Sequence, residues 1–114
     1  MATVKLTPNY AILNDGIALA SVVSQGEEDG VAVALSAQDT KTAILLQNAG
    51  GSTASAYISS EGGTVEGFTV SVGAGETRVV VVDSGFYKHL KGELKGHVHI
   101  SVDPTVKVSA VVLP

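Results

Sequence analysis

The sequence contains no cysteine and no tryptophan among its 114 residues. Without cysteine, the chain has no disulfide framework, no thiolate nucleophile and no sulfur ligand for zinc or an iron–sulfur cluster. Charged residues make up only 16% of the chain, the net charge is −4, and Arg78 is the single arginine. We therefore expect no nucleic-acid partner, because neutralising phosphates requires clustered Lys and Arg.

Long hydrophobic runs are missing as well. Strictly apolar runs such as residues 79–82 and 110–113 are four residues long, against the ~20 that a membrane-spanning helix needs. The first residues also lack the basic segment and apolar core of a secretory signal. These absences predict a protein made in the cytoplasm, with no membrane partner.

The chain instead contains many short segments rich in β-branched residues, bounded by Gly, Asn, Asp or Ser. Such segments are typical of strands joined by turns, and their regular spacing favours an all-β fold. We predict an antiparallel β-sandwich, Ig-like or jelly-roll-like, with about eight short strands. The predicted strands cover residues 3–7, 17–24, 31–36, 41–48, 53–60, 68–72, 77–83, 96–102 and 105–113.

Alternation of apolar and polar residues assigns a core-facing side to three of these strands. The predicted core-facing residues are Phe68, Val70 and Val72; Val98, Ile100 and Val102; and Val106, Val108, Ala110 and Val112. Residues 79–82 are apolar on both faces, which predicts a central strand or an interface strand. The glycine-containing segment 49–52 predicts a hairpin between residues 41–48 and 53–60.

The length predicts one domain over residues 1–114. Residues 39–114 are expected to form the compact core, with residues 1–38 as either an extended N-terminal arm or edge strands. An apolar, nearly uncharged segment of this kind can add to the sheet of a neighbour. Its predicted partner-binding residues are Val4, Leu6, Pro8, Tyr10, Ile12 and Leu13. The alternative is an ordinary edge strand of the same domain.

Histidines offer the main candidate for metal chemistry. His97 and His99 share one strand face at a spacing that suits zinc or copper, and a further ligand such as His89 or Asp103 would be needed. The alternative, which we favour, is that both lie on a solvated strand face. Asp83, Ser84 and His89 have the residue types of a hydrolase triad, but no nucleophile-elbow motif accompanies them. We therefore predict a protein that is not an enzyme, with no catalytic, cofactor-binding or metal site.

Aromatic side chains offer a second candidate surface. Tyr57 alternates with Ala56 and Ile58 and is expected to point outward, as a sugar-stacking ring would. Tyr10 and Tyr87 lie in predicted loops, so the three tyrosines do not form one platform. Binding of a carbohydrate or another surface, as in a fibre or adhesin domain, is the alternative function.

The segment from Asp39 to Pro114 resembles the small head decoration proteins, also called cement or auxiliary capsid proteins, of tailed bacteriophages. The similarity lies in DTKTAILLQNAG, GFTVSVGAGETRVVVVDSGFYK and GHVHISVDPTVKVSAVVLP, which together with the short strand between the first two cover about two-thirds of the chain. Each of these motifs is also compatible with generic sandwich turns and strands.

This resemblance implies a β-sandwich that binds and stabilises the outside of an assembled capsid. It implies the major capsid protein as a partner, a homo-oligomeric state, most often a trimer, and a location on the virion surface after synthesis in the host cytoplasm. The low charge and the apolar N-terminal segment suit such a role. The family offers no catalytic motif to transfer to this chain.

Overall fold

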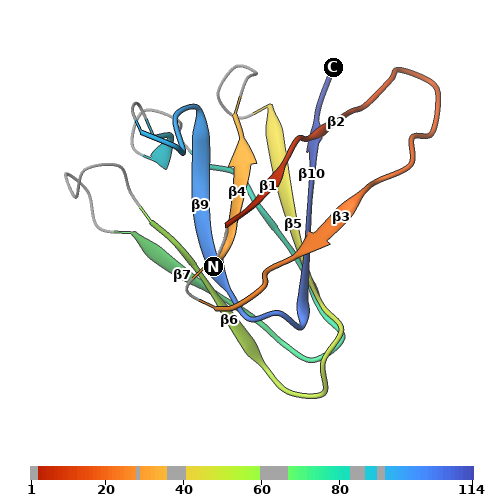
Figure 1. The fold of residues 1–114 in the computed structure, drawn as a ribbon. Helices are drawn as coiled ribbons and strands as arrows, with labels where there is room; N and C mark the ends of the chain where they lie inside the picture. Colours follow the sequence, from red (N-terminus) through yellow and green to blue (C-terminus); the bar gives the residue numbers. More distant parts are fainter. Residues whose placement is uncertain (1–2, 28, 36–40, 60–66, 83–86, 90–91) are drawn as a thin grey trace.

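The described chain, which comprises residues 3–27, 29–35, 41–59, 67–82, 87–89 and 92–114 of the computed structural model, forms two β-sheets (Figure 1). The first sheet has the order β1 (Val4–Leu6), β4 (Val31–Ala34), β9 (His97–Val102), β6 (Ala54–Ile58) and β7 (Phe68–Val72). The second has the order β2 (Asn9–Tyr10), β10 (Val106–Val112), β5 (Thr42–Asn48) and β8 (Thr77–Val80), and β3 (Ser21–Val23) also pairs with β10. The predicted all-β sandwich is confirmed, with ten described strands in place of about eight.

The core lies between the inner faces of the two sheets, and the predicted alternation describes it well. Val98, Ile100 and Val102 of β9 are fully buried, as are Val106, Val108 and Ala110 of β10. On β7, Val72 is fully buried, whereas Phe68 and Val70 are half-buried and pack against the core. Burying a side chain of this size contributes about 1.5–3 kcal/mol, so these faces supply much of the driving force for folding.

The predicted hairpin between β5 and β6 is wrong. β5 pairs with β10 and β8 in the second sheet, whereas β6 pairs with β7 and β9 in the first. Segment 49–52 therefore crosses from one sheet to the other, and segment 73–76 makes a second crossing from β7 to β8. A two-residue alternation identifies a strand but carries no information about which strand lies beside it.

Asn48, the last residue of β5, holds these two crossings together at one end of the sandwich. Its side chain is fully buried, and its Nδ2 donates to the carbonyls of Ser52 (2.8 Å) and Val72 (2.9 Å). Its Oδ1 accepts from the Gly50 N–H at 2.9 Å. Its backbone N–H donates to Glu76 and its carbonyl accepts from Gly75. A buried amide is tolerated here because its hydrogen-bonding groups have partners.

The N-terminal segment belongs to both sheets. β1 pairs in parallel with β4 in the first sheet, and β2 pairs in parallel with β10 in the second. These two parallel pairings depart from the predicted antiparallel pattern. β1 and β2 lie at sheet edges, but β4 lies between β1 and β9, and its Val31 and Val33 are fully buried. The core is therefore not confined to residues 39–114.

Replacing Asn48 with alanine is expected to lower the free energy of unfolding by about 2–4 kcal/mol, because buried carbonyl and amide groups at both crossings lose their partners. The measurement is a urea titration at constant m-value. Gln47→Ala, at the neighbouring exposed position, should change the free energy by no more than about 0.5 kcal/mol. Equal midpoints for the two variants would contradict the role given to Asn48.

Candidate functional site

The predicted histidine pair is present on the outward face of β9, where both rings are half-buried. The Nδ1 of His97 lies 2.9 Å from the Lys95 carbonyl, and the Nε2 of His99 lies 3.0 Å from the Asp29 carbonyl. Because a carbonyl oxygen only accepts, each of these ring nitrogens acts as an N–H donor. Each histidine thus uses one of its two potential metal-binding nitrogens to fix a loop against β9.

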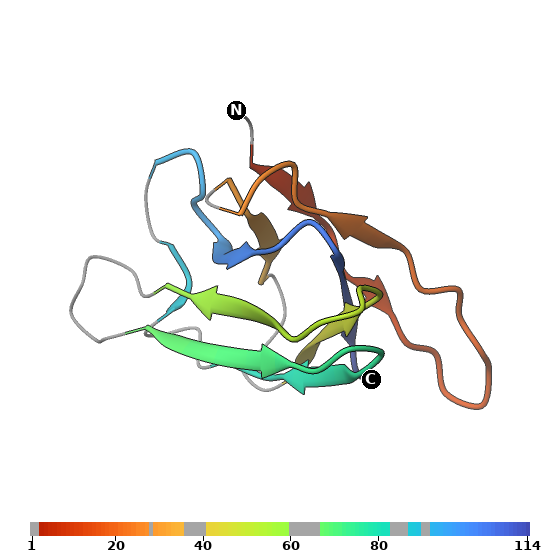
Figure 2. The same cartoon turned by 90° about the horizontal axis from the view of Figure 1, so that it is seen from below.

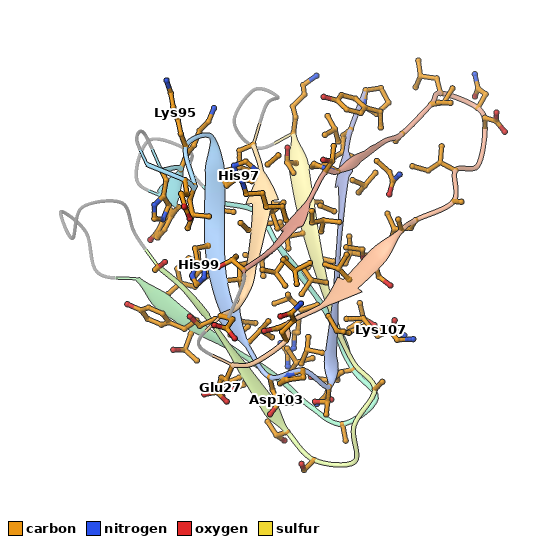
Figure 3. All side chains as sticks on the ribbon, viewed as in Figure 1. Glu27, Lys95, His97, His99, Asp103 and Lys107 are labelled. Carbon is orange, nitrogen blue, oxygen red and sulfur yellow. The ribbon has the colours of Figure 1, made fainter. Side chains whose placement is uncertain are left out.

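The two further ligands considered from the sequence lie in different places. The backbone of His89 is bonded to β9, with its N–H donating to His97 (2.8 Å) and its carbonyl accepting from Gly96 (2.7 Å). Asp103 lies beyond the opposite end of β9 (Figure 3). Within the described residues, no group of three or more His, Asp or Glu side chains is placed to hold a metal ion. Asp83 and Ser84, considered with His89, lie outside the described residues.

Asp103 organises the turn between β9 and β10. Its Oδ1 accepts from the N–H and from the hydroxyl of Thr105, both at 2.9 Å. These bonds hold the pKa of the Asp103 carboxyl below its ordinary value, and the bond from the backbone N–H has the larger effect. Glu76 plays a comparable part in the 73–76 crossing: the Gly73 N–H and then the Arg78 guanidinium lower the pKa of its carboxyl. Both carboxylates thus stabilise turns.

The predicted partner-binding residues divide into two groups. Leu6 is only 4% exposed and belongs to the core, and Pro8 is buried as well. Val4 is half-buried in β1 opposite Val31. For Leu6 and Pro8 the predicted partner contact is wrong, because the segment that crosses from β1 to β2 buries both side chains within the same molecule. Tyr10, Ile12 and Leu13 remain 58%, 57% and 74% exposed.

These three exposed residues lie on, or at the base of, a segment that extends from the body of the molecule. Both views show residues 11–20, here called the projecting loop, reaching beyond β2 and β3 (Figures 1 and 2). The Ala11 N–H donates to Val112 (2.8 Å), and the Ala20 N–H donates to the Asn9 side chain (3.0 Å). The chain reverses near Asn14, which has a φ of 61°. The projecting loop is therefore fixed at both ends.

The outward face of the second sheet is a site that the sequence interpretation only half identified. Residues 79–82 were expected in a central or interface strand, but β8 lies at the sheet edge and, among the described strands, pairs with β5 alone. The expectation of a central strand is wrong, because Val80 and Val82 face the core while Val79 and Val81 are 62% and 48% exposed. A strand that is apolar on both faces is typical of a strand buried on both sides. The surface that packs against its outward side can belong to the same chain or to another one.

The outward face of the first sheet has the opposite character. Its side chains include Ser55, Ser71 and Thr69, together with His99 and Ser101. Tyr57 is 42% exposed there, between Thr69 of β7 and Ser101 of β9 in the strand register. A side chain at position 67 would collide with the Tyr57 ring, so the glycine there leaves room for the ring.

Comparison with known proteins gave no relatives: no protein-family model, no curated protein and no solved structure matches the chain. No helix among the described residues has the length and hydrophobicity to cross a bilayer.

Acidification is expected to destabilise the protein partly through Asp103. Because the folded-state pKa lies below the ordinary value of 3.8, the contribution is present above that value and is lost as the pH falls through the folded-state pKa. Asp103→Asn should therefore show a smaller loss of stability than the unaltered protein between about pH 5 and pH 2, measured by urea midpoints. Glu93→Gln, at an exposed loop position, is the control. An unchanged pH dependence in Asp103→Asn would contradict this assignment.

Proposed function

We propose that the protein is a non-enzymatic structural protein that attaches to a larger protein assembly through its projecting loop. The resemblance to head decoration proteins suggests the assembly: the outer surface of a bacteriophage capsid, with the major capsid protein as partner. On this proposal the protein acts as a homo-oligomer, a trimer by the same resemblance, and reaches the virion surface after synthesis in the host cytoplasm.

The observation that carries this proposal is the exposure of Tyr10 at the end of β2, and of Ile12 and Leu13 on a loop fixed at both ends. Burying one such side chain contributes about 1.5–3 kcal/mol, so covering three of them is a substantial driving force for association. A loop fixed before binding also loses less conformational entropy when it docks. Large apolar and aromatic side chains on a preformed support are typical of binding hot spots.

The roles of the titratable side chains support a structural function. His97 and His99 donate to loop carbonyls, and Asp103 and Glu76 accept from turn N–H groups. Each of these groups is already used to hold the backbone. A catalytic acid, base or nucleophile would instead direct its reactive atom toward a substrate.

The capsid proposal is tested by co-expressing the chain with the major capsid protein encoded in the same genome. The unaltered protein should sediment with assembled shells. The double variant Ile12→Ser, Leu13→Ser should bind roughly tenfold or more weakly, because two apolar contacts are lost.

Thr69→Ala is the control, since Thr69 is exposed on the polar face of the first sheet, and its binding should be unchanged. Shells that sediment without the unaltered protein would overturn the capsid proposal. Binding that is insensitive to the Ile12 and Leu13 substitutions would overturn the role of the loop.

Carbohydrate binding is a second candidate, favoured by the position of Tyr57. Its ring is partly exposed on a face otherwise lined by hydroxyl and imidazole side chains, which offer stacking and hydrogen bonding to a sugar. One ring on an open sheet face provides a smaller contact than the loop does, so we rank this function second.

Tyr57→Ala decides that candidate. If the protein binds sugars at this face, a glycan array should show a signal that Tyr57→Ala abolishes and Tyr10→Ala leaves intact. Both variants remove one exposed tyrosine ring, so they differ only in location. The absence of any glycan signal, or equal loss in both variants, would exclude Tyr57 as a sugar platform.

A further inference from the structure

The outward face of the second sheet carries an apolar patch across three strands. We define the outer patch as Ala43 and Leu45 of β5, Val79 and Val81 on and beside β8, and Val111 of β10. The strand register places Leu45 beside Val79, and Ala43 beside Val111. Val79 and Val81 are exposed, and Ala43, Leu45 and Val111 are half-buried.

The same sheet already buries its other face in the core, through Ile44, Leu46 and Val108 among others. An antiparallel sheet with one solvated face normally alternates apolar and polar residues, as strands β6, β7 and β9 of the first sheet do. A contiguous apolar patch on a sheet face marks a surface that another protein covers. The contrast between the two outward faces within one molecule makes the outer patch a specific feature, since a generally apolar composition would affect both faces.

The projecting loop has the chemistry to cover this patch. Its side chains Ile12, Leu13 and Leu19 are exposed and Ile17 is half-buried, so most of the loop's apolar surface is not covered by its own molecule. Asp15 is the only charged residue in segment 11–20. Among the described residues beside the outer patch, those that face outward and carry a charge are the cations Lys107 and Lys41. The Nζ of Lys41 donates to the Pro114 carbonyl, which leaves Lys107 as the better match for Asp15.

The projecting loop is also long enough to cover the outer patch. The patch spans three neighbouring strands, with about 10 Å between the outer two, and its residues on one strand lie no more than two positions, or about 7 Å, apart. A ten-residue loop that reverses at its middle has two legs of about five residues, each up to ~17 Å long. One leg can therefore cross the whole patch.

We propose that the outer patch is covered by the projecting loop of a second copy of this chain. This inference rests on the proposed function and refines it: the loop joins neighbouring copies, and the ring that they form attaches to the shell. The Ile12 and Leu13 substitutions then weaken shell binding because the ring separates into single copies, which lose its multivalent attachment. One contact covers both exposed apolar surfaces and pairs Asp15 of one copy with Lys107 of the next. Because the two surfaces differ, the contact is head-to-tail, and it closes into a ring when the rotation between copies allows. In such a ring every copy both donates a loop and receives one.

The test is a charge exchange followed by sedimentation equilibrium over a range of protein concentrations. The unaltered protein should associate. Asp15→Lys alone and Lys107→Glu alone should each weaken association by roughly tenfold, because attraction becomes repulsion. The double variant should return to within about threefold of the unaltered protein. Lys41→Glu combined with Asp15→Lys should restore less than the Lys107→Glu combination does.

A second variant tests the apolar contact. Val79→Glu should abolish association, because it places a carboxylate in the centre of the covered patch. Its urea midpoint should stay close to that of the unaltered protein, since Val79 is 62% exposed. Ser55→Glu puts the same carboxylate on the polar outward face of the first sheet and should leave association unchanged.

A protein that stays monomeric at every concentration overturns this inference, as does association that the exchanged pair fails to restore. The shell assay separates this failure from failure of the proposed function. A monomer whose shell binding still depends on Ile12 and Leu13 overturns only the contact between copies. Head-to-tail oligomers that do not sediment with shells overturn only the capsid proposal.

Discussion

The buried amide of Asn48 is the interaction on which the arrangement of the two sheets depends. It lies fully buried where β5 ends, and its side-chain bonds reach Gly50, Ser52 and Val72. Burying an amide without partners would cost several kcal/mol, so only an arrangement that brings these backbone groups together is stable. That arrangement is the one in which segments 49–52 and 73–76 both cross between sheets. The hydrogen bonds of one polar side chain thus select this strand pairing, because apolar packing by itself is compatible with several pairings.

The two sheets share an inner chemistry and differ in their outer chemistry. Both contribute valine and isoleucine to the core, but hydroxyl and imidazole groups cover the outside of the first sheet, whereas the outer patch occupies the second. A low fraction of charged residues can reflect either a large core or surfaces that partners cover. In this molecule the missing charge is concentrated on one sheet face and on the projecting loop, which favours the second explanation.

The side chains in the sequence that are best suited to metal binding or acid–base chemistry instead stabilise the structure. His97 and His99 fix loops to β9, Asp103 shapes the β9–β10 turn, and Glu76 braces the 73–76 crossing. Placing titratable side chains at turns and loop contacts stabilises connections that contain little apolar surface. The exposed apolar residues are instead the surfaces available to a partner, because the free-energy cost of exposing them to water is recovered only when a partner covers them.

The fold class, and the side chains of β9 and β10 that enter the core, could be predicted from local patterns in the sequence. Alternation along β9 and β10 is a local property, because successive side chains of any strand point to opposite faces. Strand partners are not local, which is why the β5–β6 hairpin was predicted and the inter-sheet crossing at Asn48 was not. Likewise, six apolar N-terminal residues looked alike in sequence. Only the tertiary structure placed Leu6 and Pro8 inside and Tyr10, Ile12 and Leu13 outside, since exposure depends on what packs against a residue.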